Sequence, residues 1–365
     1  MAKNIRIKDI AKAAGVSAGT VDRVLHKRGK VSPEALNKVM EVLSNTDYKP
    51  NMIARMLGSY RPYQIGVLLP YPATDEYWSK VMSGIVQGEN EWAQYGIHLN
   101  IGMFDIMEKG SFEKTSEEIL NHNPDGILIA PIFYHETLPF FKECQERNIP
   151  YVLFNTNIKE SNALSFFGQN LYESGRVAAD LVCLGQEAGE YGVLHFDEDL
   201  NDSVHLLEKE RGFSDYVKEK FGDVPVHSLN RTSSSDSLFR EKLDSILSIP
   251  NLRGLFVSSS KGTAVAASLL ENFGKKGIRL VGYDLLEDNI KYLESGVIDF
   301  LINQRPQEQA LLGLGCLANH LVFKKKSPEI NLFPLGIITK QNLSSYLINL
   351  ENTIEKKEQH LVEAQ

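Results

Sequence analysis

Three apolar runs of the chain each end in a polar side chain, and these side chains are the first candidates for chemistry. The runs are YVLFN, RLVGYD and DFLINQ, which end at Asn155, Asp284 and Gln304. Amides and carboxylates at such positions can pair with the donors and acceptors of a hydroxyl-rich ligand. In parallel α/β sheets, ligands bind beyond the carboxyl ends of the strands. The three residues therefore indicate a ligand site, provided that the runs are strands of such a sheet.

Two short motifs resemble catalytic or cofactor-binding signatures, but neither has its required context. Gly313, Gly315 and Ala318 fit GxGxxA, yet they lie inside the helical run EQALLGLGCLANHLVF instead of at a strand-to-helix turn. Ser258 and Lys261 fit SxxK, but the SDN and KTG segments that accompany this motif are missing. Close helix packing explains the glycines better, so we expect neither enzyme activity nor a cofactor.

The cysteines do not form a framework or a metal site. Cys144, Cys183 and Cys316 are odd in number, far apart and without CxxC or Cys/His ligand spacing. Clusters of His or Asp with metal-ligand spacing are also missing from the sequence. We expect buried free thiols and no bound metal.

Length and composition suggest two or three globular units in the cytoplasm. The chain has 365 residues, of which 42% are hydrophobic and 24% charged. The first ten residues, MAKNIRIKDI, are charged throughout and lack the apolar core of a signal peptide. No later apolar run approaches the ~20 residues that cross a bilayer. We therefore expect no membrane partner.

The net charge of −8 conceals two parts of opposite sign. Residues 1–61 contain twelve Lys/Arg and five Asp/Glu, a net charge of +7, whereas the remainder carries −15. A basic module beside an acidic body is typical of a phosphate-binding head on an effector domain.

The basic module divides into three short helical patterns. Gly15 ends the first, Ser17 is a plausible N-cap of the second, and Ser32-Pro33-Glu34 starts the third. Apolar faces are formed by Ile7, Ile10, Ala11 and Ala14, by Val21, Val24 and Leu25, and by Leu36, Val39, Val42 and Leu43. Three small helices with a glycine turn predict a helix-turn-helix headpiece.

From residue 63 onward, short apolar strands alternate with longer helical patterns. The strand candidates are residues 64–70, 98–104, 126–132, 151–155, 191–196, 254–259, 279–284 and 299–304. This βαβ alternation predicts an α/β fold of parallel sheets with helices on both faces, and its length predicts two such lobes.

At this point the chain resembles the lactose repressor (LacI) family. The matching runs are IKDIAKAAGVSAGTVDRVLHKRGKVSPEALNKV and YKPNMIARMLGS, followed by a body similar to periplasmic sugar-binding proteins. The resemblance implies a helix-turn-helix domain over residues 1–49, a hinge helix and linker over 50–62, a two-lobed effector-binding and dimerisation core of the periplasmic-binding-protein type I class over 63–340, and a helical tail over 341–365.

The resemblance also implies where DNA is contacted. The second helix would enter the major groove, where Arg23 can bind guanine bidentately. Leu57 would insert into the minor groove at the operator centre. The other implied contacts are Ser17, Ala18, Gly19, Thr20, Lys27, Arg28 and Lys30 in the headpiece and Asn51, Ala54 and Arg55 in the hinge. Ala18 and Gly19 replace a polar or bulky pair common in the family, and Asp22 replaces a serine.

In the body, the family's effector lies between lobes that the chain joins at three crossings, expected near residues 157–163, 286–292 and 322–328. The positions that match ligand-contacting residues are Asp75, Tyr77, Trp78, Asn155, Gln169, Arg211, Asp284 and Gln304. Hydrogen-bonding groups and aromatic rings together suit a sugar or sugar derivative. Thr156 and the run Ser258–Ser260 depart from the family pattern, which leaves the identity of the sugar open.

The sequence thus predicts a homodimeric transcription regulator, a repressor associated with the nucleoid, whose partners are a palindromic double-stranded DNA operator and a carbohydrate effector. A nucleobase or nucleoside effector is one alternative. A cytoplasmic binding protein or enzyme whose N-terminal helices serve only assembly is another. In the tail, Leu343, Leu347, Leu350, Ile354 and Leu361 are spaced as in a short tetramerising coil, but Lys357 interrupts them and a surface helix is favoured.

Overall fold

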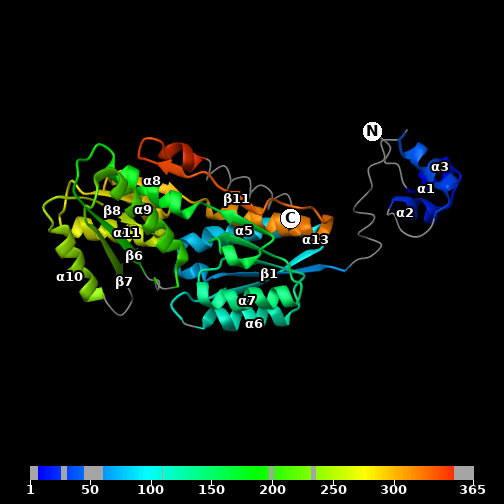
Figure 1. Ribbon diagram of the computed structural model, residues 1–365, viewed down its shortest axis with the longest axis horizontal. Coiled ribbons are helices and arrows are strands. Elements are labelled where there is room, and N and C mark those ends of the chain that lie inside the picture. Colours follow the sequence, from blue (N-terminus) through cyan, green and yellow to red (C-terminus); the bar gives the residue numbers. More distant parts are fainter. Residues whose placement is uncertain are drawn as a thin grey trace, which may run out of the picture. The chain divides into compact units, whose positions relative to one another are not determined.

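The computed structural model describes residues 7–25, 31–44, 61–108, 110–196, 200, 202–231 and 236–348 (Figure 1). The chain forms two compact units, Met1–Arg61 and Pro62–Gln365. Each unit has its own hydrophobic core. Among the helices of these ranges, none combines the length and the apolar character that a membrane crossing requires.

The first unit contains three short helices. They are α1 (Ile7–Ala14), α2 (Ala18–Leu25) and α3 (Pro33–Ser44). Gly15 ends α1 with a φ of 65°, a left-handed conformation that glycine adopts without strain. The Ser17 hydroxyl accepts a hydrogen bond of 3.1 Å from the Thr20 N–H, and Ser32 caps α3 in the same way through Ala35. Both predicted N-caps are therefore present.

The core of this unit differs from the predicted one at a single described position. Its buried members are Ile10, Ala11, Ala14, Val21, Val24 and Val39, with Val42 and Leu43 packed against them. Leu36 was expected in this stripe but is 42% exposed. The inward face of α3 is formed by Val39 with Val42 and Leu43, which lie three and four residues after it on the same side of the helix.

The second unit consists of two lobes, each built on a six-stranded sheet. Lobe 1 has the strand order β11-β5-β4-β3-β1-β2, and all of its described pairings are parallel. Helices α6 and α7 cover one face of this sheet, and α5 and α13 cover the other (Figure 1). The elements are β1 (Tyr63–Pro70), α5 (Glu76–Ala93), β2 (Ile97–Phe104), α6 (Ser111–Asn121), β3 (Gly126–Ile129), α7 (Tyr134–Glu146), β4 (Tyr151–Asn155), β5 (Ser165–Gly168), α13 (Pro306–Phe323) and β11 (Ile330–Leu332), with short 3₁₀ turns at Pro72–Thr74 and Lys159–Ser161.

Lobe 2 has the strand order β12-β10-β9-β8-β6-β7, in which only β12 runs antiparallel to its neighbour among the described pairings. Its elements are α8 (Leu171–Cys183), β6 (Glu190–Phe196), α9 (Val204–Phe221), β7 (Val226–Arg231), α10 (Asp236–Leu247), β8 (Leu252–Val257), α11 (Ser260–Asn272), β9 (Arg279–Tyr283), α12 (Glu287–Ser295), β10 (Phe300–Asn303) and β12 (Gly336–Ile338). The predicted pair of α/β lobes is confirmed.

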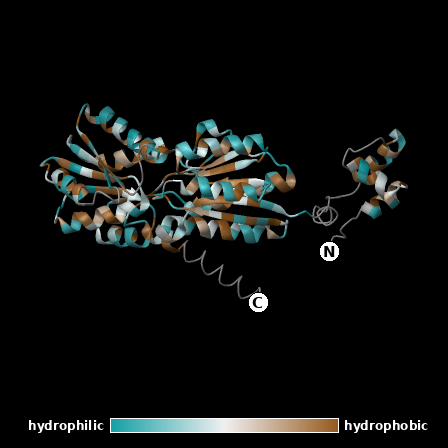
Figure 2. Ribbon diagram, turned by 90° about the horizontal axis from the view of Figure 1, so that it is seen from below, coloured by the Kyte–Doolittle hydropathy of each residue, from teal (hydrophilic) through white to brown (hydrophobic). Residues whose placement is uncertain are grey.

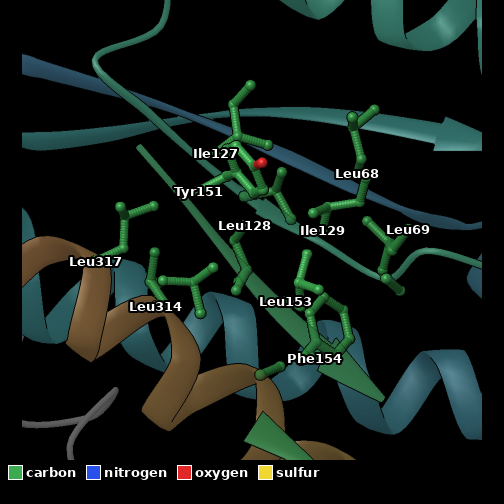
Figure 3. Close-up of a cluster of buried hydrophobic side chains, with 14 of the residues drawn as sticks. Leu68, Leu69, Ile127, Leu128, Ile129, Tyr151, Leu153, Phe154, Leu314 and Leu317 are labelled. Carbon is green, nitrogen blue, oxygen red and sulfur yellow. The ribbon is translucent and has the colours of Figure 1, made fainter. Parts of the chain in front are cut away.

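The central strands are apolar because helices cover both of their faces. Figure 2 shows hydrophobic strands inside each lobe and hydrophilic residues on the outer faces of the helices. In lobe 1, Leu128 and Leu153 pack against Leu314 and Leu317 of α13 (Figure 3). Gly313 belongs to this contact, since a Cβ added there would lie 3.0 Å from Leu128 Cδ1. The described geometry thus supports a packing role for the glycines of the GxGxxA run.

The crossings between the lobes are not where the sequence placed them. The chain passes from lobe 1 to lobe 2 between β5 and α8, returns between β10 and α13, and crosses again between β11 and β12. Of the segments expected to cross, 157–163 instead precedes β5, 286–292 is the N-cap and first part of α12, and 322–328 contains the end of α13 and the residues after it. The first and third crossings were placed too early because β5 and β11 are too short to be recognised as strands, so lobe 1 was ended before its last strand. The second crossing was placed before β10, although residues 299–304 were predicted as a strand.

The start of the tail packs against lobe 2. Leu343 is buried in the core of that lobe, and Leu347 packs against it. These two leucines are therefore engaged within their own chain. Leu350, Ile354 and Leu361 lie outside the described residues.

Candidate functional site

A cavity lies between the two lobes at the carboxyl ends of their strands. Its empty volume is about 430 Å³, including the part that opens to solvent. The lining residues are Asp75, Tyr77, Trp78, Ile132 and Asn155 from lobe 1, and Leu171, His205, Lys209, Ser258, Ser259, Ser260 and Gln304 from lobe 2 or its junction with lobe 1. Of the eight positions matched from sequence, five line this cavity.

The lobe 1 wall combines aromatic rings with an oriented amide. Asn155 ends β4 with a φ of 68°, and its Nδ2 donates a hydrogen bond of 2.6 Å to the Tyr77 hydroxyl oxygen. The rings of Tyr77 and Trp78 meet edge to face, with centroids 5.0 Å apart. Burial raises the pKa of Tyr77, so the phenol remains neutral. This wall offers an apolar surface beside fixed hydrogen-bonding groups.

Asp75 begins α5 and caps it. Its Oδ1 accepts a hydrogen bond of 2.8 Å from the Tyr77 N–H. A carboxylate at this position compensates the positive end of the helix dipole. The cap fixes the first turn of α5, which carries both aromatic rings of the wall.

Asp284 lies behind the lobe 2 wall and positions its neighbours. It is 1% exposed, and it accepts hydrogen bonds from the Gln304 N–H (2.6 Å), the Gln304 side-chain amide (2.6 Å) and the Ser260 hydroxyl (2.5 Å). Burial raises the pKa of Asp284, whereas the hydrogen bonds from Ser260 and Gln304 act in the opposite direction. Asp284 therefore orients two residues that line the cavity but does not line it itself.

Lys209 was not among the predicted ligand residues, although it lines the cavity. Its side chain is buried, and Nζ donates to the Ser258 carbonyl (2.9 Å) and to Gln304 Oε1 (3.3 Å). The ammonium also lies 3.8 Å from the centroid of the Tyr283 ring. Helix α8 approaches α9 closely at this point, since a Cβ on Gly175 would lie 1.9 Å from the Lys209 carbonyl oxygen. The backbone of Lys209 is thus fixed by tight helix packing.

Arg211 does not lie at the cavity, which corrects the prediction made for it. Its guanidinium pairs with Glu208 at 2.6 Å and lies over the Tyr172 ring, with 59% of the side chain exposed. Position 211 is two residues beyond Lys209, about 200° further around the helix, so it points away from the cavity. The inward positions of α9 are instead His205 and Lys209, whose spacing of four residues was visible in the sequence.

Gln169 also lies outside the cavity lining. It is buried at the first crossing, and its Nε2 donates to the carbonyl oxygens of Asn303 (3.0 Å) and Pro334 (3.3 Å). Those two residues flank the second and third crossings. Gln169 therefore connects the three crossings to one another.

A second polar group lies beneath Ser258. The Ser258 hydroxyl pairs with His195 Nδ1 at 2.7 Å, and His195 Nε2 pairs with Glu210 at 2.8 Å. Burial disfavours the ionised form of Glu210, but the hydrogen bond and charge of His195 outweigh it and lower the pKa of that carboxyl. The Ser258 hydroxyl is thus engaged with His195.

Two carboxylates cap helices of the opposite lobe. Glu76 of α5 accepts a hydrogen bond of 3.0 Å from the Glu287 N–H at the start of α12. In the reverse direction, Asp202 precedes α9, and its Oδ1 accepts a hydrogen bond of 2.7 Å from the His135 N–H in α7. These two hydrogen bonds connect the lobes in both directions.

The described residues show no cluster of three or more His, Cys, Asp or Glu side chains that could hold a metal ion. Cys144, Cys183 and Cys316 are buried free thiols, as expected.

The candidate DNA-contacting residues of α2 lie on its outer side. Ser17, Ala18, Gly19 and Arg23 are exposed, and Thr20 is partly buried. Arg23 Nε donates a hydrogen bond of 3.1 Å to the Gly19 carbonyl oxygen, one helical turn earlier. The remaining predicted contacts, Lys27, Arg28, Lys30, Asn51, Ala54, Arg55 and Leu57, lie outside the described residues.

Comparison with known proteins relates both units to bacterial regulators. Residues 6–51 match the lacI family of bacterial regulatory proteins, and residues 65–325 match the periplasmic binding protein domain. The ribose operon repressor of Halalkalibacterium halodurans is 25% identical over 323 residues, which cover 87% of this chain and 89% of that repressor. The HTH-type transcriptional regulator MalR of Streptococcus pneumoniae is 28% identical over 157 residues, which cover 42% of this chain. The matched part spans about half the length, 46%, of MalR.

Solved structures agree with these matches. A protein from Bacteroides fragilis that is assigned to the LacI transcriptional regulators is 30% identical, with a TM-score of 0.71 over 78% of this chain and 100% of that chain. GanP, a glucose-galactose binding protein from Geobacillus stearothermophilus, shares the fold at 22% identity and a TM-score of 0.68, over 78% of this chain and 99% of its own. With a helix-turn-helix unit followed by two lobes around a cavity, this chain belongs to the lacI family of bacterial regulatory proteins.

Proposed function

We propose that the protein is a transcriptional repressor whose affinity for a DNA operator is controlled by a sugar or sugar derivative bound between its lobes. The observation that carries this proposal is the combination of two units in one chain. The first presents an exposed helix with hydroxyl and cationic side chains, and the second encloses a polar cavity between lobes. The relatives named above include a ribose operon repressor, which supports the same combination of roles.

On the DNA side, we assign base recognition to Arg23 and phosphate contacts to Ser17 and Thr20. Arginine can bind guanine O6 and N7 together, which discriminates against other bases by about 1–3 kcal/mol. Ala18 offers a methyl contact to thymine, and Gly19 allows close approach of the backbone. Lys27, Arg28, Asn51, Ala54, Arg55 and Leu57 complete the proposed interface. The regulator acts in the cytoplasm as a homodimer on a palindromic operator, and the tail is the segment that would extend a dimer to a tetramer.

On the effector side, we assign direct contacts to the cavity-lining residues Asp75, Tyr77, Trp78, Asn155 and Gln304. A sugar has hydroxyls that require paired donors and acceptors, and it has apolar C–H faces that pack on aromatic rings. The lobe 1 wall supplies both within one surface. Asp284 acts through Gln304 and Ser260, and Gln169 acts at the crossings. Effector binding changes the orientation of the lobes relative to each other, and this change alters the affinity for the operator. Such a coupling between two binding sites is typically ~1–3 kcal/mol.

Operator selection followed by a salt titration tests the DNA role. The full-length protein is expected to select a palindrome from random duplexes and to lose affinity steeply as salt increases, because several Lys and Arg side chains displace counterions from phosphates. Arg23→Ala should abolish the preference for the selected site, whereas Ala18→Ser should change it modestly. A shallow salt slope with no selected palindrome would reject the function.

A thermal-shift screen of sugars, nucleobases and nucleosides tests the effector role. A sugar is expected to raise the melting temperature and to alter operator affinity, and Trp78→Ala should weaken that response. Stabilisation by nucleosides alone would replace the sugar with a nucleobase ligand stacked on Trp78. A Trp78→Ala protein with a full response would remove this residue from the site.

A further inference from the structure

Two helices at the boundary between the lobes begin without a capping side chain of their own. The N-cap residue of α7 in lobe 1 is Phe133, and the N-cap residue of α12 in lobe 2 is Leu286. An apolar side chain cannot accept a hydrogen bond from the N–H groups that the first turn of a helix leaves free. Both helices therefore depend on an acceptor from another part of the molecule or from water.

In each case the opposite lobe provides the acceptor. At the start of α7, the carbonyl oxygen of Asp202 accepts a hydrogen bond of 3.1 Å from the Tyr134 N–H, and Asp202 Oδ1 accepts one of 2.7 Å from the His135 N–H. At the start of α12, Glu76 Oε2 accepts a hydrogen bond of 3.0 Å from the Glu287 N–H. Because donor and acceptor belong to different lobes, these three bonds require the lobes to keep the arrangement described.

The capping carboxylate of lobe 1 adjoins the aromatic wall of the cavity. Glu76 lies in sequence among residues of the cavity lining, which are Asp75, Tyr77 and Trp78. Its second oxygen, Oε1, lies 3.3 Å from Lys80 Nζ, one turn later in α5, and this ion pair restrains the direction of the side chain. A movement that separates Glu76 from α12 would therefore also move the aromatic wall away from lobe 2.

The lobe 2 partners of these caps adjoin the opposite wall. Asp202 lies two residues before the start of α9, the helix that contributes His205 and Lys209 to the cavity lining. Glu287 lies three residues after Asp284, the carboxylate behind the lobe 2 wall. Separating the two walls of the cavity would therefore break the caps in both directions.

We propose that Glu76 and Asp202 are positioning residues of the effector site, which stabilise the closed arrangement of the lobes without touching the effector. This inference rests on the proposed function and adds to it the groups that set the balance between open and closed lobes. A helix cap changes such a balance about fivefold. An effector that binds only the closed arrangement has an apparent affinity proportional to the closed fraction of the free protein. Each cap therefore raises the effector affinity by up to about fivefold.

Distance measurements in the absence of any effector test the closed arrangement directly. Spin labels are attached to the full-length chain through Met107→Cys in lobe 1 and Leu238→Cys in lobe 2, two exposed positions that follow the carboxyl ends of the edge strands β2 and β7. The three native cysteines are buried. Pulsed electron paramagnetic resonance should show that the ratio of open to closed molecules rises about fivefold in Glu76→Ala or Asp202→Ala, and about twenty-five-fold in the double variant if the caps act independently. Distance distributions that match the wild type in all three variants would overturn the proposal.

Binding kinetics distinguish a positioning role from a general loss of stability. With ribose, glucose and galactose as probes, stopped-flow tryptophan fluorescence should show a dissociation rate about fivefold faster in Glu76→Ala and in Asp202→Ala. The association rate should not fall, because the caps form only after the lobes close. A variant with a folding defect would instead contain less competent protein with an unchanged dissociation rate, and that result would overturn the positioning role. If none of the sugars binds the wild type, the sugar-responsive function is rejected, and the distance measurements still decide whether the caps hold the lobes closed.

Amide variants test whether the cap hydrogen bonds carry the effect. Asp202→Asn and Glu76→Gln keep a side-chain oxygen that can accept the same hydrogen bond, so their distance distributions and dissociation rates should be close to those of the wild type. Glu113→Ala is the matched control, because it removes an exposed acidic residue from the first turn of another helix of lobe 1, α6, and it should behave like the wild type. Equal losses in the amide and alanine variants, or an equal loss in Glu113→Ala, would overturn the role assigned to the caps.

Discussion

Gln169 and Asn303 lie at different crossings between the lobes, and the side-chain Nε2 of Gln169 donates a hydrogen bond of 3.0 Å to the Asn303 carbonyl oxygen. The same nitrogen donates to Pro334 at the third crossing. A single buried amide therefore holds together the three segments about which the lobes would move. Gln169 was predicted from sequence to contact the ligand, but its side-chain amide nitrogen is hydrogen-bonded at the crossings.

Replacing Gln169 by leucine should destabilise the unit. The carbonyl groups of Asn303 and Pro334 would lose the buried amide that donates to them, at a cost of about 1–3 kcal/mol in the free energy of unfolding. Urea denaturation measures the change. Gln94→Leu is the matched control, because Gln94 is exposed and donates only to a carbonyl of its own helix. Equal midpoints for the two variants would argue against a structural role of Gln169 at the crossings.

The carboxylate caps between the lobes predict a reciprocal pattern of amide protection. Glu76→Ala should increase hydrogen exchange at the Glu287 amide about fivefold, since a helix cap contributes about 1 kcal/mol. Asp202→Ala should do the same for the His135 amide and leave Glu287 unchanged. Mass spectrometry of exchanged peptides measures both sites. Unchanged protection in both variants would contradict the proposed contacts.

Gly19→Ala should separate the stability of α2 from DNA recognition. The nearest atom to an added Cβ is Ser17 Oγ at 3.8 Å, and the backbone does not require glycine, so the helix should gain about 1 kcal/mol. If DNA approaches this exposed backbone closely, operator affinity should fall while the melting temperature rises. Ala18→Ser, at the adjacent exposed position, is the control. Unchanged operator affinity in Gly19→Ala would remove Gly19 from the interface.

Tyr77→Phe should weaken effector binding, whereas Arg211→Ala should leave it unchanged. Arg211 lies outside the cavity with an exposed partner, so its loss should change stability by no more than about 0.5 kcal/mol and leave effector affinity unchanged. Tyr77→Phe removes the acceptor of the Asn155 amide inside the cavity and should weaken binding several-fold. Calorimetric titration compares the two variants. A larger loss in Arg211→Ala would restore the ligand role that its position in the sequence suggested.

Asp284 and Glu210 should give the free energy of unfolding opposite dependences on pH. Burial raises the pKa of Asp284 above its ordinary 3.8, so the folded chain retains a proton that the unfolded chain releases. The contribution of Asp284 to the free energy of unfolding therefore falls as pH rises from 3.8 through the folded pKa. Asp284→Asn should remove this decline. His195 lowers the pKa of Glu210 below 4.5 despite its burial, so that contribution is present above pH 4.5 and lost as pH falls through the folded value.

Urea denaturation at a series of pH values tests both signs. As pH rises, the free energy of unfolding of the wild type should fall relative to that of Asp284→Asn. As pH falls, the free energy of unfolding of the wild type should fall relative to that of Glu210→Gln. Parallel curves for wild type and both variants would contradict the assigned shifts.

The sequence predicted the central strands because helices cover both of their faces, which makes them continuous apolar runs. It did not predict β11 or β7, for a physical reason. Ile330 and Leu332 of β11 are exposed at the edge of their sheet, and in β7 only Leu229 is buried, so neither strand shows the pattern of a covered strand. Without β5 and β11, the first and third crossings could not be located.

The candidate site was predicted where it depends on strand ends and was missed where it depends on helix packing. Asn155 and Gln304 follow strands, so their position was available from the alternation of elements. Lys209 is a charged residue on a helix with a charged surface, and such residues are normally solvated. Its burial depends on the close approach of α8 at Gly175, a contact that sequence spacing alone does not reveal.

The boundary between Arg61 and Pro62 also has an evolutionary consequence. The residues proposed to choose the DNA sequence and those proposed to choose the small molecule belong to units that each bury a separate core. Substitutions can therefore accumulate on one side without disturbing the packing of the other. A new target gene and a new metabolic signal can be acquired independently, and a chimaera joined at this boundary would exchange one specificity while retaining the other.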